Sequence, residues 1–247
     1  MEEIATLMMV TYNRLELTKQ TLNNIITNTK YPYNFVIVDN NSTDGTQEYL
    51  KEFREACNLN IVLILNDENK GIAVGRNQGL LEANKLNTVW YSTVDNDILL
   101  PEKWLTRCIS LLKADKRFAM IGVNFEERQY PILKIGNEEI QYKHRGNLGT
   151  ACTVFHKSFH KMVGFFNTEY GLYGEEDADM GARAQAIGLK LGYLKENGVH
   201  LGEGDADQGE YREFKTESHK RNLQKFNENA RDYFQRRKSL YIPCKGC

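Results

Sequence analysis

Two groups of acidic residues have types and spacings suited to catalysis. Asp95 and Asp97 flank Asn96 and directly follow an apolar run at 88–94. Mg²⁺ and Mn²⁺ prefer oxygen ligands and typically join one or two protein carboxylates to phosphate oxygens. The tripeptide therefore predicts a cation bound to a diphosphate, and a solvated turn of the same composition is the alternative interpretation.

A second acidic group, at 175–179, opens a predicted helix and includes Glu176 and Asp177. Crowded carboxylates can raise the pKa of one of them, which suits a general base. Acidic residues in a first helical turn also interact favourably with the helix dipole, without any catalytic role. His200 follows a late apolar run and is either structural or a ligand. From the residues alone, both interpretations of each feature stay open.

Polar loops after other apolar runs contain further candidate residues. The segment 69–79 combines glycines with Lys70 and Arg76 ahead of a helix, and such turns present N–H groups to anions. Its glycines follow neither the GxGxxG nor the GxxxxGK[ST] spacing, which argues against dinucleotide and P-loop enzymes. The loop 39–46 consists of common turn residues, and a carboxylate at such a strand end could accept a hydrogen bond from a pyrimidine N–H.

Short apolar runs alternate with segments of helical periodicity, which predicts a mainly parallel α/β sheet covered on both faces. Ligands bind outside the carboxyl ends of the strands of such sheets. The clusters beginning at Thr11, Asp39 and Asp95 all lie at strand ends, so we expect them to share a site. Strands are expected at 4–10, 35–38, 61–65, 88–94, 118–124, 150–155 and 189–194, with a hairpin at 132–144. Helices are expected from 15 to the turn at 31–32, at 46–56 and at 176–187. Another follows the segment 69–79 and ends at 86, one begins at about Pro101, and a short one follows the strand at 150–155 and ends at 163. Helical spacing also continues along 215–238.

In order along the chain, these segments resemble family 2 glycosyltransferases. The resemblance is carried by VTYNR (10–14), VDNNSTDGT (38–46), NKGIAVGRNQG (69–79), DND (95–97), the segment 149–179 and VHLG (199–202). It implies the GT-A fold, an α/β, Rossmann-like and predominantly parallel central sheet flanked by helices. We expect that domain at 1–204, with a C-terminal helical extension and tail at 205–247 packed on the same domain.

The resemblance also implies roles for the acidic residues. Asp97 would hold a divalent cation, Mn²⁺ or Mg²⁺, with Asp95 and His200 as additional metal ligands, or with His200 as a contact to the diphosphate instead. Asp177 would be the catalytic base that takes the proton of the acceptor hydroxyl. Glu176 is the second choice, because an extra acid precedes the family's E-D-x-D pattern and leaves its register open.

Further positions are matched to the nucleotide-sugar donor. Thr11 and Tyr12 would border the base, Asp39 would hydrogen-bond a pyrimidine, and Arg76 would face the base or the diphosphate. Asp95 would contact the ribose or the sugar. The complete set of expected donor contacts is Thr11, Tyr12, Asn13, Arg14, Asp39, Asn41, Lys70, Gly71, Arg76, Asp95 and Asn96.

The expected activity is therefore an inverting, metal-dependent transfer of a sugar from a nucleotide-diphosphate sugar, with a UDP-sugar favoured. The acceptor would be a hydroxyl of a glycan, a lipid-linked molecule or a protein. A catalytically inactive nucleotide-sugar-binding module is one alternative. A sugar nucleotidyltransferase is another, but its glycine-rich loop should follow the first strand, and 11–15 contains no glycine.

Composition limits the remaining classes of partner. The 247 residues carry a formal net charge of -1, which gives no global attraction to nucleic acid. The first ten residues include no basic residue of the kind that begins a secretory signal, and no apolar run reaches membrane-spanning length. We therefore expect a cytoplasmic protein, with peripheral membrane contact through the basic C-terminal helix as a further hypothesis. Five cysteines do not make a disulfide framework. Cys244 and Cys247 are interpreted as an incidental tail, with half a zinc site or a redox pair as the alternatives.

Overall fold

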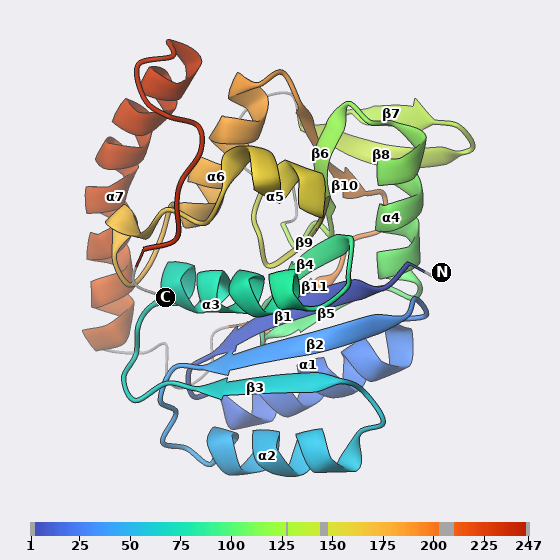
Figure 1. Cartoon of the computed structure of the whole chain (residues 1–247), viewed down its shortest axis with the longest axis vertical. Coiled ribbons are helices and arrows are strands. Elements are labelled where there is room, and N and C mark those ends of the chain that lie inside the picture. Colours follow the sequence, from blue (N-terminus) through green and yellow to red (C-terminus); the bar gives the residue numbers. More distant parts are fainter. Residues whose placement is uncertain (1–2, 127, 144–147, 203–209, 246–247) are drawn as a thin grey trace.

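The computed structural model describes residues 3–126, 128–143, 148–202 and 210–245, and its centre is one twisted β-sheet (Figure 1). Within this part of the chain the sheet has nine strands in the order β3-β2-β1-β4-β9-β6-β10-β8-β7. All of them except β8 and β9 run in the same direction, so the predicted, predominantly parallel α/β sheet is confirmed. The strands are β1 (Ala5–Thr11), β2 (Tyr33–Asp39), β3 (Ile61–Leu65), β4 (Trp90–Val94), β6 (Phe118–Gly122), β7 (Ile132–Ile135), β8 (Glu138–Lys143), β9 (Cys152–His156) and β10 (Lys190–Leu194).

Helices cover both faces of this sheet. The buried side chains of α1, α2 and α4 belong to one apolar cluster, and those of α3, α5 and α6 belong to a second cluster on the opposite face. The helices are α1 (Leu15–Asn28), α2 (Thr46–Ala56), α3 (Ile72–Lys85), α4 (Trp104–Ala114), α5 (Lys157–Val163), α6 (Glu176–Ala186) and α7 (Glu210–Phe234), and a 3₁₀ turn lies at Thr168–Tyr170. The layered arrangement leaves the loops at the strand ends as the region where a ligand can enter.

The C-terminal helix α7 packs beside α6 at the edge of the molecule (Figure 1). After α7 the chain turns back along the domain, where Ile242 pairs with Gly164. The expected division between 204 and 205 lies outside the described residues, as does Cys247. Residues on α7 and the returning tail therefore contact the main domain directly.

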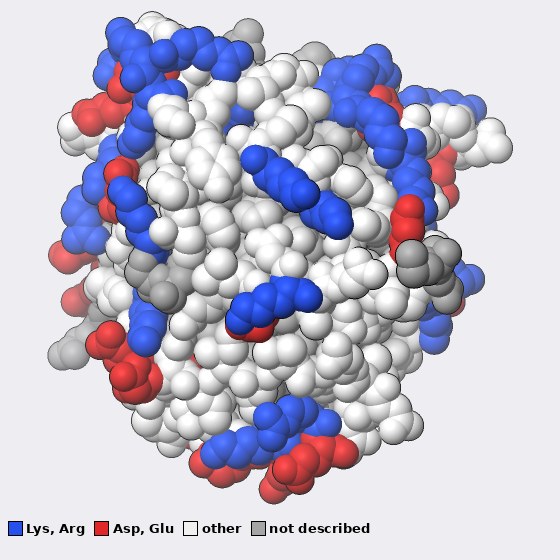
Figure 2. Space-filling model, viewed as in Figure 1, with Lys and Arg blue, Asp and Glu red and all other residues white. Residues whose placement is uncertain are grey.

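Basic side chains gather at the upper end of α7 on the face drawn in Figure 2, whereas the centre of that face carries few charges. Exposed basic residues at and beyond this end of the helix are Arg231, Arg236 and Arg237. No helix within the described ranges has both the length and the apolar character needed to cross a membrane.

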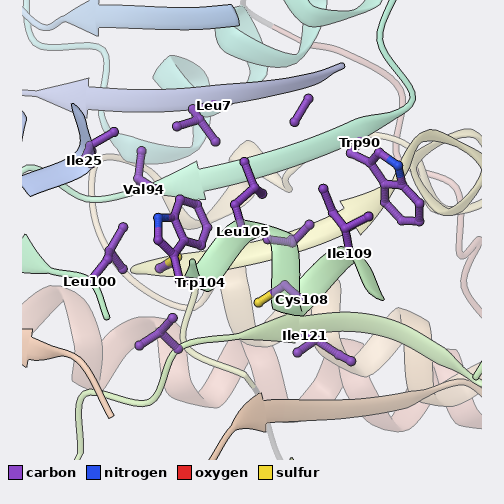
Figure 3. Close-up of a cluster of buried hydrophobic side chains, with 14 of the residues drawn as sticks. Leu7, Ile25, Trp90, Val94, Leu100, Trp104, Leu105, Cys108, Ile109 and Ile121 are labelled. Atoms are coloured by element: carbon purple, nitrogen blue, oxygen red, sulfur yellow. The ribbon is translucent and has the colours of Figure 1, made fainter. Parts of the chain in front are cut away.

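The larger apolar cluster lies between the sheet and α1, α2 and α4 (Figure 3). Side chains alternate between the faces of a strand, so Leu7 of β1 enters this cluster whereas its neighbour Met8 enters the other. Trp104 begins α4 and is fully buried, and its Nε1 donates to Thr29 Oγ1 at 3.0 Å. Burial of this kind fixes the sheet, and with it the positions at which the strands end.

Most of the expected elements are present within one to three residues, but two short strands were missed. β5 (Ile98–Leu99) pairs antiparallel with β11 (Val199–His200) in a separate small sheet. Two-residue strands show no periodicity, so the sequence pattern could not reveal them. α7 also begins earlier than expected, at Glu210 rather than at 215.

Candidate active site

The strand-end loops surround one cavity of 590 Å³. It opens at the carboxyl ends of β1 and β4, next to the first turns of α3 and α6. The site residues expected from the sequence that line it are Thr11, Tyr12, Arg14, Gly71, Arg76, Asp95, Asn96, Asp97, Glu176, Asp177 and His200. Segments separated by more than 150 positions therefore contribute to the same cavity.

Asp39 is fully buried and does not line this cavity. Its Oδ1 accepts hydrogen bonds from the Ser42 N–H at 2.9 Å and from Gln47 Nε2 at 2.8 Å. Its Oδ2 accepts from the hydroxyls of Thr11 and Ser42. The carboxylate thus holds the loop after β2 against the end of β1, and its contact with a pyrimidine stays a prediction.

Three other predicted donor contacts also lie outside the cavity lining: Asn13, Asn41 and Lys70. Asn13 joins two loops, because its N–H donates to Ser42 Oγ and its Oδ1 accepts from the Thr43 N–H. Lys70 forms an ion pair with Asp67 at 3.1 Å. The contacts of Asn13 and Lys70 thus lie within the loops around the site.

Arg14 and His200 both approach the carboxylate of Asp97. Arg14 Nη1 donates to Asp97 Oδ2, and His200 Nε2 lies 3.6 Å from the same oxygen. The small β5–β11 sheet brings His200 to this place, since it pairs His200 with Ile98, next to Asp97. Burial and the negative charge of Asp95 raise the pKa of Asp97, while the positive charges around it oppose the rise.

The ring of His200 is oriented by its own loop. The Gly202 N–H donates to Nδ1 at 3.1 Å, so the neutral ring carries its proton on Nε2, facing Asp97. Ligation of a cation through Nε2 would require that proton to move to Nδ1 and the Gly202 hydrogen bond to break. In this arrangement the Nε2–H faces Asp97 Oδ2 at 3.6 Å, too long for a hydrogen bond, and it could donate to an anion bound in the cavity.

Asp97 is suited to hold a divalent cation. Within the described ranges, no group of three or more His, Cys, Asp or Glu residues forms a complete metal site. Mg²⁺ and Mn²⁺ need no such group when a diphosphate and water supply the remaining oxygens. A buried carboxylate in an acidic cavity fits that requirement, because a cation offsets the cost of its ionised form.

Arg76 connects the two acidic groups. This buried guanidinium donates to Asp95 Oδ1 at 3.0 Å and to Glu176 Oε1 at 2.8 Å, and it also contacts Thr150. Its other face lies over the ring of Phe166, with 5.4 Å between the guanidinium carbon and the ring centroid. Arg76 therefore fixes the position of the first turn of α6 relative to the end of β4.

Glu176 and Asp177 are adjacent but have different surroundings. Glu176 is buried against Arg76, whereas Asp177 is half-buried and its Oδ1 accepts from the Ala178 N–H at 2.6 Å. Burial, followed by the charge of Asp177, raises the pKa of Glu176 to about 7. Burial also raises the pKa of Asp177, opposed by Arg76. Both line the cavity, and Asp177 is the more accessible of the two.

The last acid of the E-D-x-D pattern, Asp179, has a structural role. It is fully buried, with an ion pair to Arg183 at 2.7 Å. It also accepts hydrogen bonds from the hydroxyls of Tyr170 and Tyr233, which come from the preceding loop and from α7. Asp179 thus joins α6, this loop and the C-terminal helix.

Sequence reasoning missed the contribution of α7 to the cavity. Phe214, Lys215 and His219 line it, and His219 Nδ1 lies 2.8 Å from Glu175 Oε1. Glu175 has the left-handed backbone conformation, with φ 69°. Helical periodicity indicated α7, but no local signal showed which of its faces meets a site far away in the chain.

Comparison with known proteins identifies the same group of enzymes along most of the chain. Residues 6–168 match the model of glycosyl transferase family 2, and residues 131–216 match a model described as the N-terminal domain of galactosyltransferase. Glycosyltransferase AglE of Haloferax volcanii is 30% identical over 118 residues, covering 47% of this chain and 37% of AglE. Glycosyltransferase GlyA of Streptococcus pneumoniae serotype 4 is 33% identical over 92 residues, covering 37% of this chain and 12% of GlyA. The matched regions are thus well under half the length of these relatives.

Solved structures share the fold at low sequence identity. The mannosyltransferase PcManGT of Pyrobaculum calidifontis, in complex with GDP-Man and Mn²⁺, aligns with a TM-score of 0.64 and 19% identity over 86% of this chain and 59% of its own. GalNAc-T7 with UDP, GalNAc and Mn²⁺ aligns with a TM-score of 0.70 and 13% identity, over 95% of this chain and 56% of the GalNAc-T7 chain. TarS of S. aureus with UDP-GlcNAc aligns with a TM-score of 0.63 and 15% identity, over 95% of this chain and 71% of the TarS chain. The GT-A fold expected from the sequence is confirmed.

Proposed function

This chain belongs to glycosyl transferase family 2, and we propose that it transfers a sugar from a nucleotide-diphosphate sugar to an acceptor hydroxyl with inversion at the anomeric carbon. One observation carries the proposal: a single cavity holds Asp97 and Asp177, and Arg76 joins the acidic groups to which they belong. A cation site and a base at different points of one cavity are what such a transfer requires.

The donor would enter along the ends of β1 and β4. Thr11, Tyr12 and Arg14 line this part of the cavity, and the cavity is large enough for a ligand of this class. We favour a UDP-sugar, since UDP or UDP-GlcNAc is bound in several structural relatives, although PcManGT binds GDP-Man. Asp39 would recognise a pyrimidine only if it released one of its internal hydrogen bonds.

Asp97 would hold the cation, Mn²⁺ or Mg²⁺, with Asp95 and His200 as further candidate ligands. When bound, the cation would neutralise charge on the leaving diphosphate, an effect worth several kcal/mol in comparable reactions. Arg14 forms an ion pair with Asp97, so a cation would compete with Arg14 for this carboxylate. The released guanidinium would lie beside the cavity that the diphosphate enters.

Asp177 would act as the base. Its carboxylate would take the proton of the acceptor hydroxyl as that oxygen attacks the anomeric carbon from the side opposite the diphosphate. Such a base typically contributes about 10²- to 10⁴-fold to the rate. We assign Glu176 a positioning role, because its carboxylate is buried and bound to Arg76.

We further propose that 1–204 and 205–247 act as one catalytic unit, since α7 lines the cavity. The acceptor would be a glycan, a lipid-linked molecule or a protein, and a lipid-linked acceptor agrees with the basic end of α7 (Figure 2). The inactive binding module stays the alternative. A nucleotidyltransferase is disfavoured, because the loop after β1 has no glycine.

The test is nucleotide binding and turnover by the full chain. UDP, GDP and dTDP are each added with and without Mn²⁺, and thermal stabilisation is measured, followed by release of nucleotide from the corresponding sugar donors. We expect Mn²⁺-dependent stabilisation by at least one nucleotide and its loss in Asp97→Ala. Glu102→Ala, which removes an exposed carboxylate that does not line the cavity, is the matched control. Equal Mn²⁺-dependent binding by Asp97→Ala would refute the metal assignment, and binding without turnover would favour the inactive module.

A further inference from the structure

The helix α7 presents a lysine to the cavity. Lys215 and His219 are four residues apart, so they lie on the same side of the helix, and both line the cavity. Asn222, on the following turn, donates to the carbonyl oxygens of Tyr170 and Tyr173 at 2.6 and 2.9 Å. These contacts fix α7 against the loop that borders the cavity, and so they fix the place of Lys215.

Lys215 lines the same cavity as Asp97 and packs against the loop that borders it. Its ammonium is 5.2 Å from the centroid of the Tyr173 ring, and its positive charge acts on Asp97. One turn later, His219 contacts Glu175, which directly precedes the acidic pair of α6. The lysine therefore shares the cavity with Asp97, where its charge can act on a diphosphate held at that carboxylate.

The charges around the cavity make this lysine important for an anionic donor. The cavity is lined by five acidic residues: Asp95, Asp97, Glu175, Glu176 and Asp177. The guanidinium groups of Arg14 and Arg76 are directed at carboxylates among them. A diphosphate entering so acidic a cavity needs a cationic partner, and a lysine ammonium binds phosphate as a compact charge.

We propose that Lys215 binds the β-phosphate of the donor and stabilises the departing diphosphate; this inference rests on the proposed function. The bond between the anomeric carbon and the β-phosphate oxygen breaks, and its electron pair stays on that oxygen. The acceptor oxygen forms the new bond, and its proton goes to Asp177. Lys215 keeps its proton throughout and contributes charge alone, so the C-terminal helix is part of the donor site.

The experiment compares UDP with UMP, which differ by the β-phosphate. Binding of each to the full chain in the presence of Mn²⁺ is measured by calorimetry, with the GDP and GMP pair used if the wild type prefers guanine. We expect Lys215→Ala to weaken binding of the diphosphate about tenfold, since a hydrogen bond to a charged group is lost. Binding of the monophosphate should be unchanged, and Lys215→Arg should restore most of the diphosphate affinity.

Lys220→Ala is the matched control, because Lys220 is exposed on the same helix and does not line the cavity. Thermal unfolding of every variant verifies that α7 still folds. Unchanged diphosphate binding by Lys215→Ala, or an equal loss for both nucleotides, would overturn the proposed contact. Failure of the wild type to bind any nucleotide with Mn²⁺ would instead overturn the proposed function, and this inference with it.

Discussion

At the scale of single residues, the two neighbouring acids of α6 differ in what surrounds them. Glu176 is buried and its carboxylate accepts a hydrogen bond from Arg76, while Asp177 has partial exposure to the cavity. Sequence spacing left the choice of base between them open, and their difference in exposure supports Asp177. The roles of the two residues can be distinguished by experiment, because Asn and Gln variants keep the shape of each side chain and remove only its ability to take a proton.

Asp177→Asn should abolish transfer while donor binding is retained. An amide cannot take the proton of the acceptor hydroxyl, so we expect kcat to fall about 10²- to 10⁴-fold. Single-turnover transfer and nucleotide affinity, measured on the same preparation, check this. Glu176→Gln is the comparison and should keep much more activity, since a glutamine oxygen can still accept from Arg76. Near-normal transfer by Asp177→Asn would refute its assignment as the base.

The pH dependence of transfer should reflect the raised pKa values of this pair. A base must be deprotonated, so activity should fall with decreasing pH, and the fall should come at a higher pH than for an ordinary aspartate, because burial raises the pKa of Asp177. Burial raises the pKa of the neighbouring Glu176 to about 7. In Glu176→Gln a negative neighbour is lost, Asp177 ionises more easily, and the acidic limb should move to lower pH. Profiles of kcat/KM for both proteins measure the shift, and a shift to higher pH would contradict this reasoning.

At the scale of elements, Asp179 and the small β5–β11 sheet position the site from outside it. Asp179 joins α6 to α7 through Tyr233, and the small sheet brings His200 beside Asp97. Gly71 has a related role at the start of α3, where an added Cβ would lie 2.6 Å from the Cα of Leu172. Close packing there requires glycine, whose φ of 83° also disfavours other residues.

Asp179→Ala should destabilise the fold strongly. It would leave the buried Arg183 guanidinium without its carboxylate, which typically costs about 3–5 kcal/mol. Tyr233→Phe removes one hydrogen bond to the same carboxylate and should cost about 1 kcal/mol. Chemical denaturation gives both free energies of unfolding, and Tyr241→Phe, at an exposed position, serves as the control. If Asp179→Ala and Tyr233→Phe lowered the free energy of unfolding equally, the ion pair between Asp179 and Arg183 would contribute little to stability.

At the scale of the whole molecule, the fold separates a polar, acidic cavity from a basic surface at the end of α7 (Figure 2). Lys238 contacts Glu169 and Asn229 and so belongs to the packing of the tail. Arg236 and Arg237 are exposed, although Arg237 also pairs with Asp232. The two arginines are therefore the residues through which membrane contact is best tested.

Reversing both charges, Arg236→Glu with Arg237→Glu, should weaken binding to vesicles that contain anionic lipid. Each basic side chain near such a surface contributes about 1 kcal/mol, so we expect a loss of about tenfold or more. Vesicle co-sedimentation measures it, with neutral vesicles for comparison. Lys116→Glu with Lys134→Glu makes the same change of net charge at other exposed positions. An equal loss in both double variants would point to net charge, and no loss would refute a membrane role for this end of α7.

The sequence by itself determined the layered α/β fold and the strand-end clusters, because short apolar runs, helical periods and turn residues are local properties. The resemblance to family 2 glycosyltransferases added the expectation that Asp95, Asp97, Arg76 and Asp177 share one site, and in the structure all four line the same cavity. Only the tertiary structure decided that Asp39 is enclosed by internal donors and that His200 reaches Asp97. It also decided that α7 supplies Lys215 to the cavity. These features depend on which distant segments pack together, and neither a two-residue strand nor a polar helix face carries that information in its own residues.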